Sequence, residues 1–394
     1  MPKRSVRDAE VKGKRVLIRV DFNVPIDRGV ITDDTRIRAA LPTINLLRER
    51  GARIILCSHL GRPKGKVDLK FSLEPVAERL SQLEHIPITL AHAVSGPEAE
   101  AAIAGMGNGD IVMLDNVRFD PGEETNDPAL SERLAKLADI YVNDAFGAAH
   151  RAHASTAGVA ALLPAYAGLL MESEISSLSL LLSEPERPFV AILGGAKVSD
   201  KLAVIEHLLD KVNTLLIGGG MANTFLLAEG KELGASLAEG NLVEKARDIA
   251  SAAKTQGVAL MLPSDAVISS SIDGKGSVVA IDQVPAEQAI FDIGPATVSA
   301  FADVIAQART IFWNGPMGVF EKPAFNAGTK GVAEAVASSS GFSVVGGGDS
   351  VAAIEQLGLA DKIGHISTGG GASLEFVEGR VLPGIAAIPD EEKS

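Results

Sequence analysis

Short runs of apolar residues recur along the chain, separated by longer segments of mixed polarity. The runs are rich in Val, Ile and Leu and lack the alternation of apolar and polar positions that a half-exposed strand shows. They therefore predict strands buried on both faces, as in a parallel sheet. The runs lie at 15–20, 53–57, 110–114, 140–142, 189–193, 214–217, 259–262, 310–313 and 342–345.

Helical patterns lie between many of these strands. The segment 201–210 places its leucines and Ile205 on one face, and 351–357 follows Asp349 and Ser350, either of which could cap it, and stops at Gly358. Strands that alternate with helices predict an α/β fold, here with two doubly wound parallel-sheet, Rossmann-like domains.

One further helical pattern, over 169–183, divides the chain into these domains. Pro185 and Pro188 end it, and the arginine content changes across it. We expect an N-terminal domain over 1–170, a connecting helix over 171–184 and a C-terminal domain over 185–377. The connecting helix and the loops beside it are hinge candidates.

Composition narrows the class of protein. The chain has 394 residues, of which 46% are apolar, which excludes a disordered chain and allows two or three domains. Its single cysteine, Cys57, excludes a disulfide scaffold, indicates a reducing compartment and is expected to be a buried apolar residue. The net charge of −13 argues against nucleic-acid binding. The first residues lack the apolar core of a signal peptide, and Gly and Pro interrupt the longest uncharged stretches, so a cytoplasmic protein without a membrane span is expected.

The charge is uneven. Residues 1–170 carry 22 Lys and Arg against 22 Asp and Glu, whereas the remainder carries 15 against 28. Fifteen of the 19 arginines lie in the first part. Arginine is suited to bidentate binding of carboxylate and phosphate, so a few of these side chains are candidates for an anion site. The others are expected on the surface.

Unusual residues follow the predicted strands directly. In open α/β sheets ligands bind at the carboxyl ends of strands, although ordinary turns there also favour Gly, Asn and Asp. Seven such junctions in both halves favour two ligand-binding edges. In the first half they bring His59, Arg62, Arg118, Arg151 and Arg36 together with Asp21 and Asn23. This set suits a small anion that bears hydroxyls, such as a phosphorylated acid.

Two details of the first half leave alternatives. His150 and His153 have a spacing that two metal ligands could use, but no carboxylate or cysteine completes a set. Pro42 is expected to break or begin a helix near Arg36, which leaves the setting of that arginine open.

The second half offers glycine loops where strands pass into helices. The loop 346–350 ends in Asp349 and Ser350, and free amides with a helix dipole make such a place an anion site. Asp349 could cap the helix, hold Mg²⁺, or do both. The loop 194–201 adds Lys197 and Lys201, and 368–371 adds more amides. Neither a P-loop nor a dinucleotide fingerprint is present. An acid phosphate in one half and a nucleotide in the other indicate phosphoryl transfer.

Taken together, the motifs resemble one family. The chain is similar to phosphoglycerate kinases along essentially its whole length. The segments that carry the resemblance are RVDFNVP at 19–25, SHLGRP at 58–63, NVRF at 116–119, NDAFG at 143–147, HRAHAS at 150–155, GGAKV at 194–198, GGGMA at 218–222, WNGPMGVFE at 313–321, GGGDS at 346–350 and STGGGAS at 367–373.

The resemblance implies Mg²⁺-dependent, reversible transfer between ATP and the carboxylate of 3-phosphoglycerate, giving ADP and 1,3-bisphosphoglycerate, in glycolysis and gluconeogenesis. It implies a monomeric hinge enzyme whose C-terminal residues, about 378–394, pack on the first domain. The acid would be held by Asp21, Asn23, Arg36, His59, Arg62, Arg118 and Arg151. The nucleotide would be held by Gly195, Lys197, Lys201, Gly219, Asn314, Glu321, Gly347, Gly348, Asp349 and Ser350, with Asp349 on the metal.

The residues fit this chemistry because the attacking group is a carboxylate, already ionised, and needs no general base. The chain must supply positive charge and N–H donors around the migrating phosphoryl group. We assign Arg36 to one side, and Lys197, Lys201 and the amides near Gly348 and Gly370 to the other.

Two alternatives remain: an NAD-dependent oxidoreductase on a doubly wound fold, and a catalytically silent nucleotide-responsive binding protein.

Overall fold

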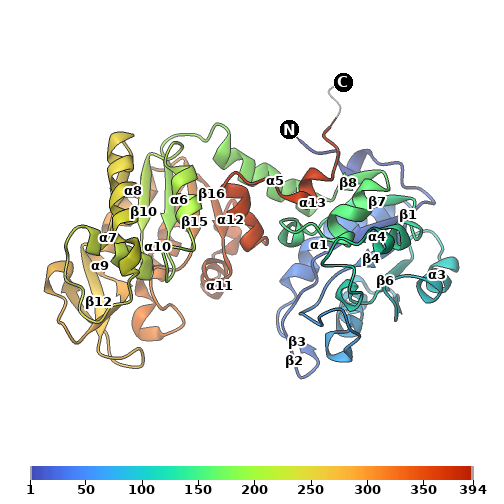
Figure 1. Cartoon of the computed structure of the whole chain (residues 1–394), viewed down its shortest axis with the longest axis horizontal. Helices are drawn as coiled ribbons and strands as arrows, with labels where there is room; N and C mark the ends of the chain where they lie inside the picture. The colour runs from blue at the N-terminus through green and yellow to red at the C-terminus, as the bar shows by residue number, and fades with distance from the viewer. Residues whose placement is uncertain (1, 392–394) are drawn as a thin grey trace. The chain divides into compact units, whose positions relative to one another are not determined.

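All nine predicted strands are present, and they lie in two separate six-stranded parallel sheets. The computed structural model describes residues 2–391 (Figure 1). The chain divides into two units: one runs from the N-terminus to Ser176 and takes in the segment from Val381 onward, and the other is Ser177–Arg380.

The sheet of the first unit has the order β5-β6-β4-β1-β7-β8. Its strands are β1 (Arg15–Arg19), β4 (Arg53–Cys57), β5 (Ile88–Ala91), β6 (Ile111–Leu114), β7 (Ile140–Asn143) and β8 (Ala165–Ala167). The helices of this unit are α1 (Thr35–Glu49), α2 (Glu74–Glu84), α3 (Pro97–Ala104), α4 (Pro128–Ala135) and, formed by the returning C-terminal segment, α13 (Pro383–Ala386). A small hairpin joins β2 (Ile26–Asp27) to β3 (Val30–Ile31).

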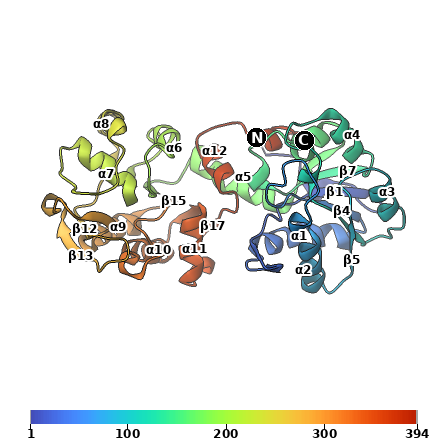
Figure 2. The same cartoon turned by 60° about the horizontal axis from the view of Figure 1, so that its bottom comes forward.

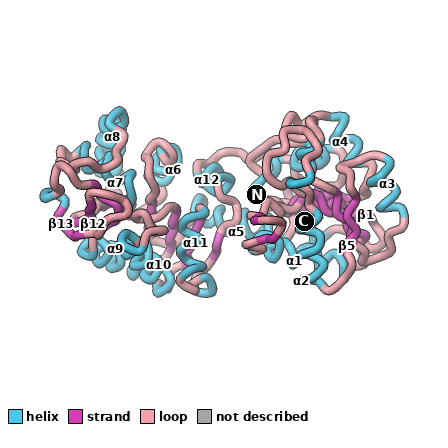
Figure 3. The backbone as a smooth tube through the Cα atoms, turned by 90° about the horizontal axis from the view of Figure 1, so that it is seen from below, coloured by secondary structure: helices cyan, strands magenta, loops and turns pink. Residues whose placement is uncertain are grey.

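Helices cover both faces of this sheet, which explains its continuous apolar strands. Val16 and Ile18 of β1 pack in one core with α1 and α2, whereas Leu17 packs in a second core with α3 and α4. Figures 2 and 3 show these helix pairs on opposite sides of the strands. Cys57 lies in the second core, fully buried and unpaired as expected, and burial raises the pKa of its thiol to about 12.

The sheet of the second unit has the order β11-β10-β9-β15-β16-β17. Its strands are β9 (Phe189–Leu193), β10 (Thr214–Ile217), β11 (Ala259–Met261), β15 (Thr310–Asn314), β16 (Phe342–Gly346) and β17 (His365–Ile366). Its helices are α6 (Leu202–Leu208), α7 (Gly219–Ala228), α8 (Val243–Thr255), α9 (Pro295–Gln307), α10 (Ala327–Ser338), α11 (Gly348–Gln356) and α12 (Gly371–Val377).

An antiparallel sheet inserted in this unit was not predicted. It consists of β12 (Asp265–Ser269), β13 (Ser277–Ala280) and β14 (Ala289–Ile293), in the order β13-β12-β14. The polar ends of β12 and the exposed side chains of β13 gave no apolar run to detect. The edge strands β5, β8 and β17 escaped prediction because they are short or partly exposed.

Two local expectations were wrong. The helix α1 continues through Pro42 instead of breaking there. The helix α11 begins at Gly348 with Gly347 as its N-cap, so that Asp349 and Ser350 lie inside its first turn and neither is the cap. A glycine at φ +90° makes the entry turn that a capping side chain was expected to make.

The helix predicted over 169–183 is α5 (Leu169–Leu182), and the division between the units falls within it, after Ser176. The chain crosses back after Arg380. In the returning segment, Asp390 forms an ion pair with Lys3 at 2.8 Å, and the Gly384 N–H donates to the Ala149 carbonyl. Of the predicted segment 378–394, residues 392–394 lie outside the described part of the chain. Between residues 2 and 391, no helix is both long and apolar enough to cross a membrane.

Candidate active site

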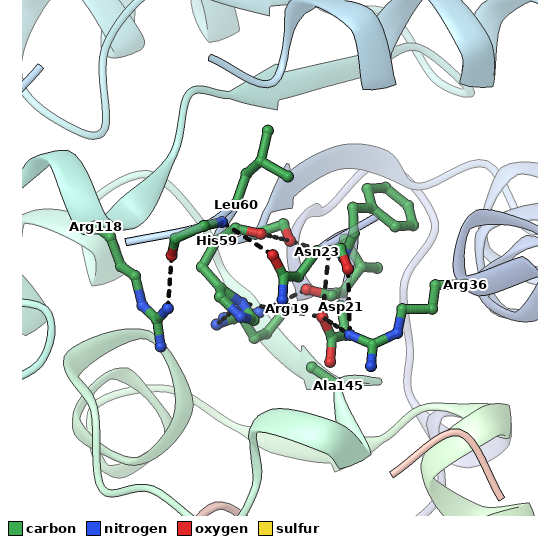
Figure 4. A network of polar contacts seen from close by, with 12 residues as sticks. Arg19, Asp21, Asn23, Arg36, His59, Leu60, Arg118 and Ala145 are labelled. Carbon is green, nitrogen blue, oxygen red and sulfur yellow. Dashed lines mark hydrogen bonds and ion pairs between the residues drawn. The ribbon is translucent and has the colours of Figure 1, made fainter. Parts of the chain in front are cut away.

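The first cluster of candidate residues lies beyond the carboxyl ends of β1 and β4, next to β7. Strand β4 lies on one side of β1 and strand β7 on the other, so the strand order reverses between β1 and β7. At such a point open α/β sheets form a crevice in which ligands bind. Figure 4 shows Asp21 and Asn23 after β1, His59 after β4, and Arg36 from the first turn of α1, all pointing toward one another.

Asp21 is the acceptor at the centre of this cluster. Its Oδ1 accepts from Arg36 Nη1 at 3.1 Å, and the same Nη1 reaches the Asn23 carbonyl at 3.4 Å. Burial raises the pKa of Asp21, whereas the electrostatic effects of His59, Arg36 and Arg19 lower it, and the net shift is downward. Asp21 is therefore a carboxylate at neutral pH, and it holds the guanidinium of Arg36, which remains 37% exposed.

Arg19 is a functional candidate that the sequence analysis left among the surface arginines, and that expectation was wrong. Its side chain is 1% exposed and donates to Ser155 Oγ at 2.8 Å, the Val20 carbonyl at 2.6 Å and His59 Nδ1 at 3.2 Å. The signal was an arginine inside the apolar run VLIRV, at the end of a strand that helices cover on both faces.

His59 is neutral in this setting. Burial lowers the pKa of its imidazole well below the ordinary value, and although Asp21 opposes this shift, the neighbouring arginines add to it. Because the Arg19 guanidinium has only donors, the Nδ1 atom facing it must accept, which places the ring proton on Nε2.

The remaining predicted cations extend the positive charge. Arg118, in the turn Val117–Phe119, is buried, and its Nη1 donates to the Gly61 carbonyl at 2.8 Å. Burial lowers the pKa of Arg118, the Glu124 carboxylate 3.1 Å from its Nε opposes this shift, and the positive charges of Arg151 and Arg19 lower the pKa further. Arg62 is exposed, and Arg151 is half-buried with its Nε donating to His150 Nε2 at 3.0 Å. The charges of Arg151 and Arg19 beside Arg118 make this place favourable for an anion.

The metal hypothesis for His150 and His153 gains no support. His153 Nδ1 faces Glu123 Oε1 at 3.7 Å, and His150 accepts from Arg151. Over residues 2–391, no three His, Cys, Asp or Glu side chains gather in a group that could hold a metal ion.

The second cluster surrounds a cavity of about 480 Å³ in the unit Ser177–Arg380. In the sheet order β11-β10-β9-β15-β16-β17, the strand order reverses between β9 and β15. The loops that follow β9, β10 and β15 line the cavity. Gly195, Gly219, Glu321 and Asp349 lie in its wall. Much of the rest is apolar, including Leu226, Leu237, Ala266, Ile281 and Ile290. A cavity with a polar rim and an apolar interior suits a nucleotide.

Lys201 and Asn314 contact each other next to two of the glycine loops, at Gly195 and Gly347. Lys201 is 8% exposed and its Nζ donates to Asn314 Oδ1. Burial lowers the pKa of Lys201 to about 8, against the opposing charges of Asp200 and Asp349. The Asn314 amide nitrogen is buried without a hydrogen-bond partner and lies 3.0 Å from where a Cβ on Gly347 would be. An unsatisfied buried donor next to Lys201 and the loop 346–350 is the feature that a bound ligand atom would complete.

The other members of this set take different positions. Gly348 and Asp349 are exposed in the first turn of α11, whereas Ser350 is buried and its Oγ accepts from the Gly315 N–H at 2.6 Å. Ser350 therefore anchors the loop after β15. Lys197 is exposed, and Gly370 is the N-cap of α12. Neither lines the cavity, and the same holds for Lys201, Asn314, Gly347, Gly348 and Ser350.

Gly219 tests how tightly the glycine loops pack. It has φ +65°, and a Cβ there would stand 2.6 Å from the Gly195 carbonyl oxygen and 2.7 Å from its nitrogen. The control is Gly230→Ala, since Gly230 has φ +82° and open space around it. In this control the free energy of unfolding should fall only by the cost of the left-handed backbone, about 1–2 kcal/mol. Gly219→Ala should lower the free energy of unfolding by about 1–3 kcal/mol more than the control, because the backbone of Gly195 must move to make room for the Cβ. Denaturant unfolding measures both, and equal losses would contradict the clash.

Comparisons with known proteins agree over the length of the chain. Residues 6–380 match the family model described as phosphoglycerate kinase. The phosphoglycerate kinase of Herpetosiphon aurantiacus is 58% identical over 394 residues, covering 99% of this chain and all of that protein. The phosphoglycerate kinase of Moorella thermoacetica is 56% identical over 393 residues, with the same coverage.

Solved structures agree as well. The phosphoglycerate kinase from Coxiella burnetii aligns with a TM-score of 0.89 and 46% identity, covering 98% of both chains. That from Pyrococcus horikoshii aligns with a TM-score of 0.86 and 34% identity, covering 97% of this chain and 98% of the other. These matches support the phosphotransferase interpretation and neither the oxidoreductase nor the silent binding protein. With a family match over nearly all of its length and relatives more than half identical, the chain belongs to the phosphoglycerate kinase family.

Proposed function

We propose that this chain transfers the γ-phosphoryl group of ATP reversibly to the carboxylate of 3-phosphoglycerate, giving ADP and 1,3-bisphosphoglycerate. The observation that carries the proposal is the pair of sites: a cluster of cations around Asp21 in one unit and a nucleotide-sized cavity of about 480 Å³ in the other. Family membership supports the same reaction.

The acid occupies the first cluster in this proposal. Its phosphate and carboxylate are held by Arg36, Arg62, Arg118, Arg151 and His59, and its hydroxyl by Asp21 and Asn23. The pKa of Asp21 supports this role, because a carboxylate that its cationic neighbours keep ionised can accept from a hydroxyl. The neutral His59 supplies a donor without adding charge.

The nucleotide occupies the second site. The apolar wall of the cavity takes the base, Glu321 at its rim takes the ribose, and the phosphates lie against the N–H groups of Gly347 and Gly348, near Lys197 and Lys201. Gly195 and Gly219 line the cavity with backbone that the nucleotide can approach closely, because their own N–H groups donate to the Pro316 and Met317 carbonyls. The amides at the start of α11 also carry the partial positive charge of the helix. The side-chain N–H groups of Asn314 have no partner and can donate to a phosphate oxygen.

The residues fit a magnesium ion that arrives with the nucleotide. Mg²⁺ is usually held by one or two carboxylates and substrate phosphates, with several waters, instead of by an all-protein cage. Asp349 supplies one such carboxylate, exposed in the wall of the cavity. When bound there, the ion supplies charge neutralisation on phosphate oxygens.

The reaction needs positioning and charge, not proton transfer. A carboxylate oxygen of the acid forms a bond to the γ-phosphorus while the bond from that phosphorus to the bridging oxygen of ADP breaks, and no proton moves. Arg36 and Lys201 stabilise the charge on the migrating group. Because the two sites belong to different units, transfer requires the units to close, excluding water that would hydrolyse ATP or the acyl phosphate. α5 joins the units and is the proposed hinge.

The low pKa of Lys201 predicts how ATP binding depends on pH. Its ammonium is lost as pH rises through about 8, so the Kd for ATP should rise roughly tenfold between pH 7 and pH 9. Calorimetry at each pH measures this. Lys201→Arg keeps its charge over the whole range and should flatten the dependence. The same slope in this variant would show that another group titrates.

We further propose that the enzyme works as a monomer in the cytoplasm, without nucleic-acid or membrane partners. The net charge of −13 and the single buried cysteine support this setting. A mass measurement in solution at working concentration tests the monomer.

One assay separates the proposed function from its alternatives. ATP and 3-phosphoglycerate are supplied with Mg²⁺, and 1,3-bisphosphoglycerate is detected through its reduction by a coupling dehydrogenase. Turnover supports the proposal. ATP binding without turnover would indicate the silent binding protein, and reduction of NAD by the chain alone would indicate the oxidoreductase.

A further inference from the structure

A row of hydrogen-bonded, buried polar side chains leads to His59 in the proposed acid site. It begins at Glu123, passes through Ser155 and Arg19, and ends at His59 (Figure 4 shows its last two members). Glu123 and Ser155 are fully buried and come from segments more than a hundred residues away from Arg19 in sequence. The catalytic scheme above uses neither of them.

Each hydrogen bond in this row can run in only one direction. Glu123 is ionised, because although burial raises the pKa of its carboxyl, His153, Arg19 and Ser155 lower it more. Its Oε1 therefore accepts the Ser155 hydroxyl at 2.6 Å, and its Oε2 accepts the Ser155 N–H at 3.0 Å. With its proton used, the Ser155 oxygen accepts from Arg19 Nε at 2.8 Å.

Two groups compete for the end of the row. Arg19 Nη2 lies 3.2 Å from His59 Nδ1 and can only donate to it, whereas Asp21 Oδ1 lies 4.0 Å from the same nitrogen and can only accept. Arg19 therefore favours a bare Nδ1 with the proton on Nε2, and Asp21 favours a protonated Nδ1. The position of Arg19 decides which tautomer the ring adopts.

We propose that Glu123 and Ser155 are positioning residues: they fix Arg19 against His59 and so hold His59 as the neutral tautomer that donates from Nε2 to the phosphorylated acid. This proposal rests on the proposed function for the identity of the acid. The same oxygen of Ser155 serves both neighbours, so removal of the hydroxyl separates Arg19 from Glu123.

The first test is the tautomer of His59, read from the nitrogen chemical shifts of the imidazole by NMR, with His59→Gln to assign the signal. The wild-type protein should show Nε2–H. Ser155→Ala should shift His59 toward a protonated Nδ1, because Asp21 then prevails. The control is Ser131→Ala, another buried serine of the same unit, whose hydroxyl donates to the Asp127 carbonyl and touches no member of the row.

The second test is binding of 3-phosphoglycerate. Ser155→Ala should raise its Kd and KM about tenfold, as expected for one lost charged hydrogen bond, while the KM for ATP stays unchanged. Glu123→Gln gives the sharper contrast. Were Glu123 only background charge, its neutralisation would tighten the binding of an anion; a positioning role predicts weaker binding.

Each outcome bears on the proposal. A protonated Nδ1 in the wild-type protein, an unchanged tautomer in Ser155→Ala, or tighter acid binding in Glu123→Gln would overturn it. Should Ser155→Ala fail to fold, the wild-type spectrum and Glu123→Gln still decide. A wild-type protein without turnover would refute the proposed function, whereas the tautomer measurement would stand independently.

Discussion

Arg36→Ala is expected to lower kcat for phosphoryl transfer by about 10³-fold or more, within the range of 10³–10⁵ that an arginine can contribute to such a reaction. The physical reason is that the guanidinium, held by Asp21 at 3.1 Å and still 37% exposed, is the one assigned to the charge of the migrating group on the acid side. The KM for 3-phosphoglycerate should also rise, because Asp21 loses its partner. The Kd for ATP should stay nearly unchanged.

The control for this variant lies on the same helix. Arg38 is exposed and forms an ion pair with Asp34 at 2.8 Å, away from Asp21. Arg38→Ala should retain kcat within about twofold, since an exposed ion pair contributes little. Substantial kcat in Arg36→Ala, with a folded protein by thermal melting, would remove Arg36 from the role of charge stabiliser.

Asp349→Asn is expected to have the second largest effect. It keeps the shape of the side chain and removes the carboxylate proposed to hold Mg²⁺, which should lower kcat/KM about 10²–10³-fold, since a bound metal contributes several kcal/mol to charge stabilisation. The Mg²⁺ concentration that gives half-maximal rate should rise. Without Asp349 the pKa of Lys201 should fall further, because Asp349 is one of the two charges that raise it.

Asp361→Asn is the matched control, an exposed carboxylate in the same unit that does not line the cavity. It should leave both the rate and the magnesium dependence unchanged. Titration of Mg²⁺ at fixed ATP compares the two variants. An unaltered magnesium requirement in Asp349→Asn would show that the ion is held elsewhere.

The sequence predicted the two central sheets because burial on both faces leaves a readable mark. In the run at 53–57, for example, every residue after Arg53 is apolar, since α1 and α3 cover opposite sides of the sheet, and the run forms β4. The insertion over 265–293 could not be found in this way. β13 has mostly exposed side chains, and Asp265 and Asp292 are buried polar residues that only three-dimensional contacts make acceptable.

For the site, the sequence named residues but not their states. Asp21, Asn23 and His59 were expected near one another from their positions after strands, whereas the setting of Arg36 was left open; the structure brings all four together. Arg19 was missed because its side-chain acceptors, on Ser155 and His59, lie far along the chain, and the sequence alone does not place them beside it. The N-cap of α11 was misassigned because Gly347 takes a positive φ, and the sequence does not show which of the three adjacent glycines makes the entry turn.

The central claim is direct transfer from ATP to a carboxylate. ATP labelled on its γ-phosphorus is incubated with the protein, Mg²⁺ and 3-phosphoglycerate, and the product is treated with hydroxylamine, which cleaves acyl phosphates to hydroxamates. The account predicts that label enters 1,3-bisphosphoglycerate, that hydroxylamine releases it as phosphate with one hydroxamate formed for each, and that neither occurs without the acid. Label that passes only into inorganic phosphate, with no hydroxamate, would contradict it.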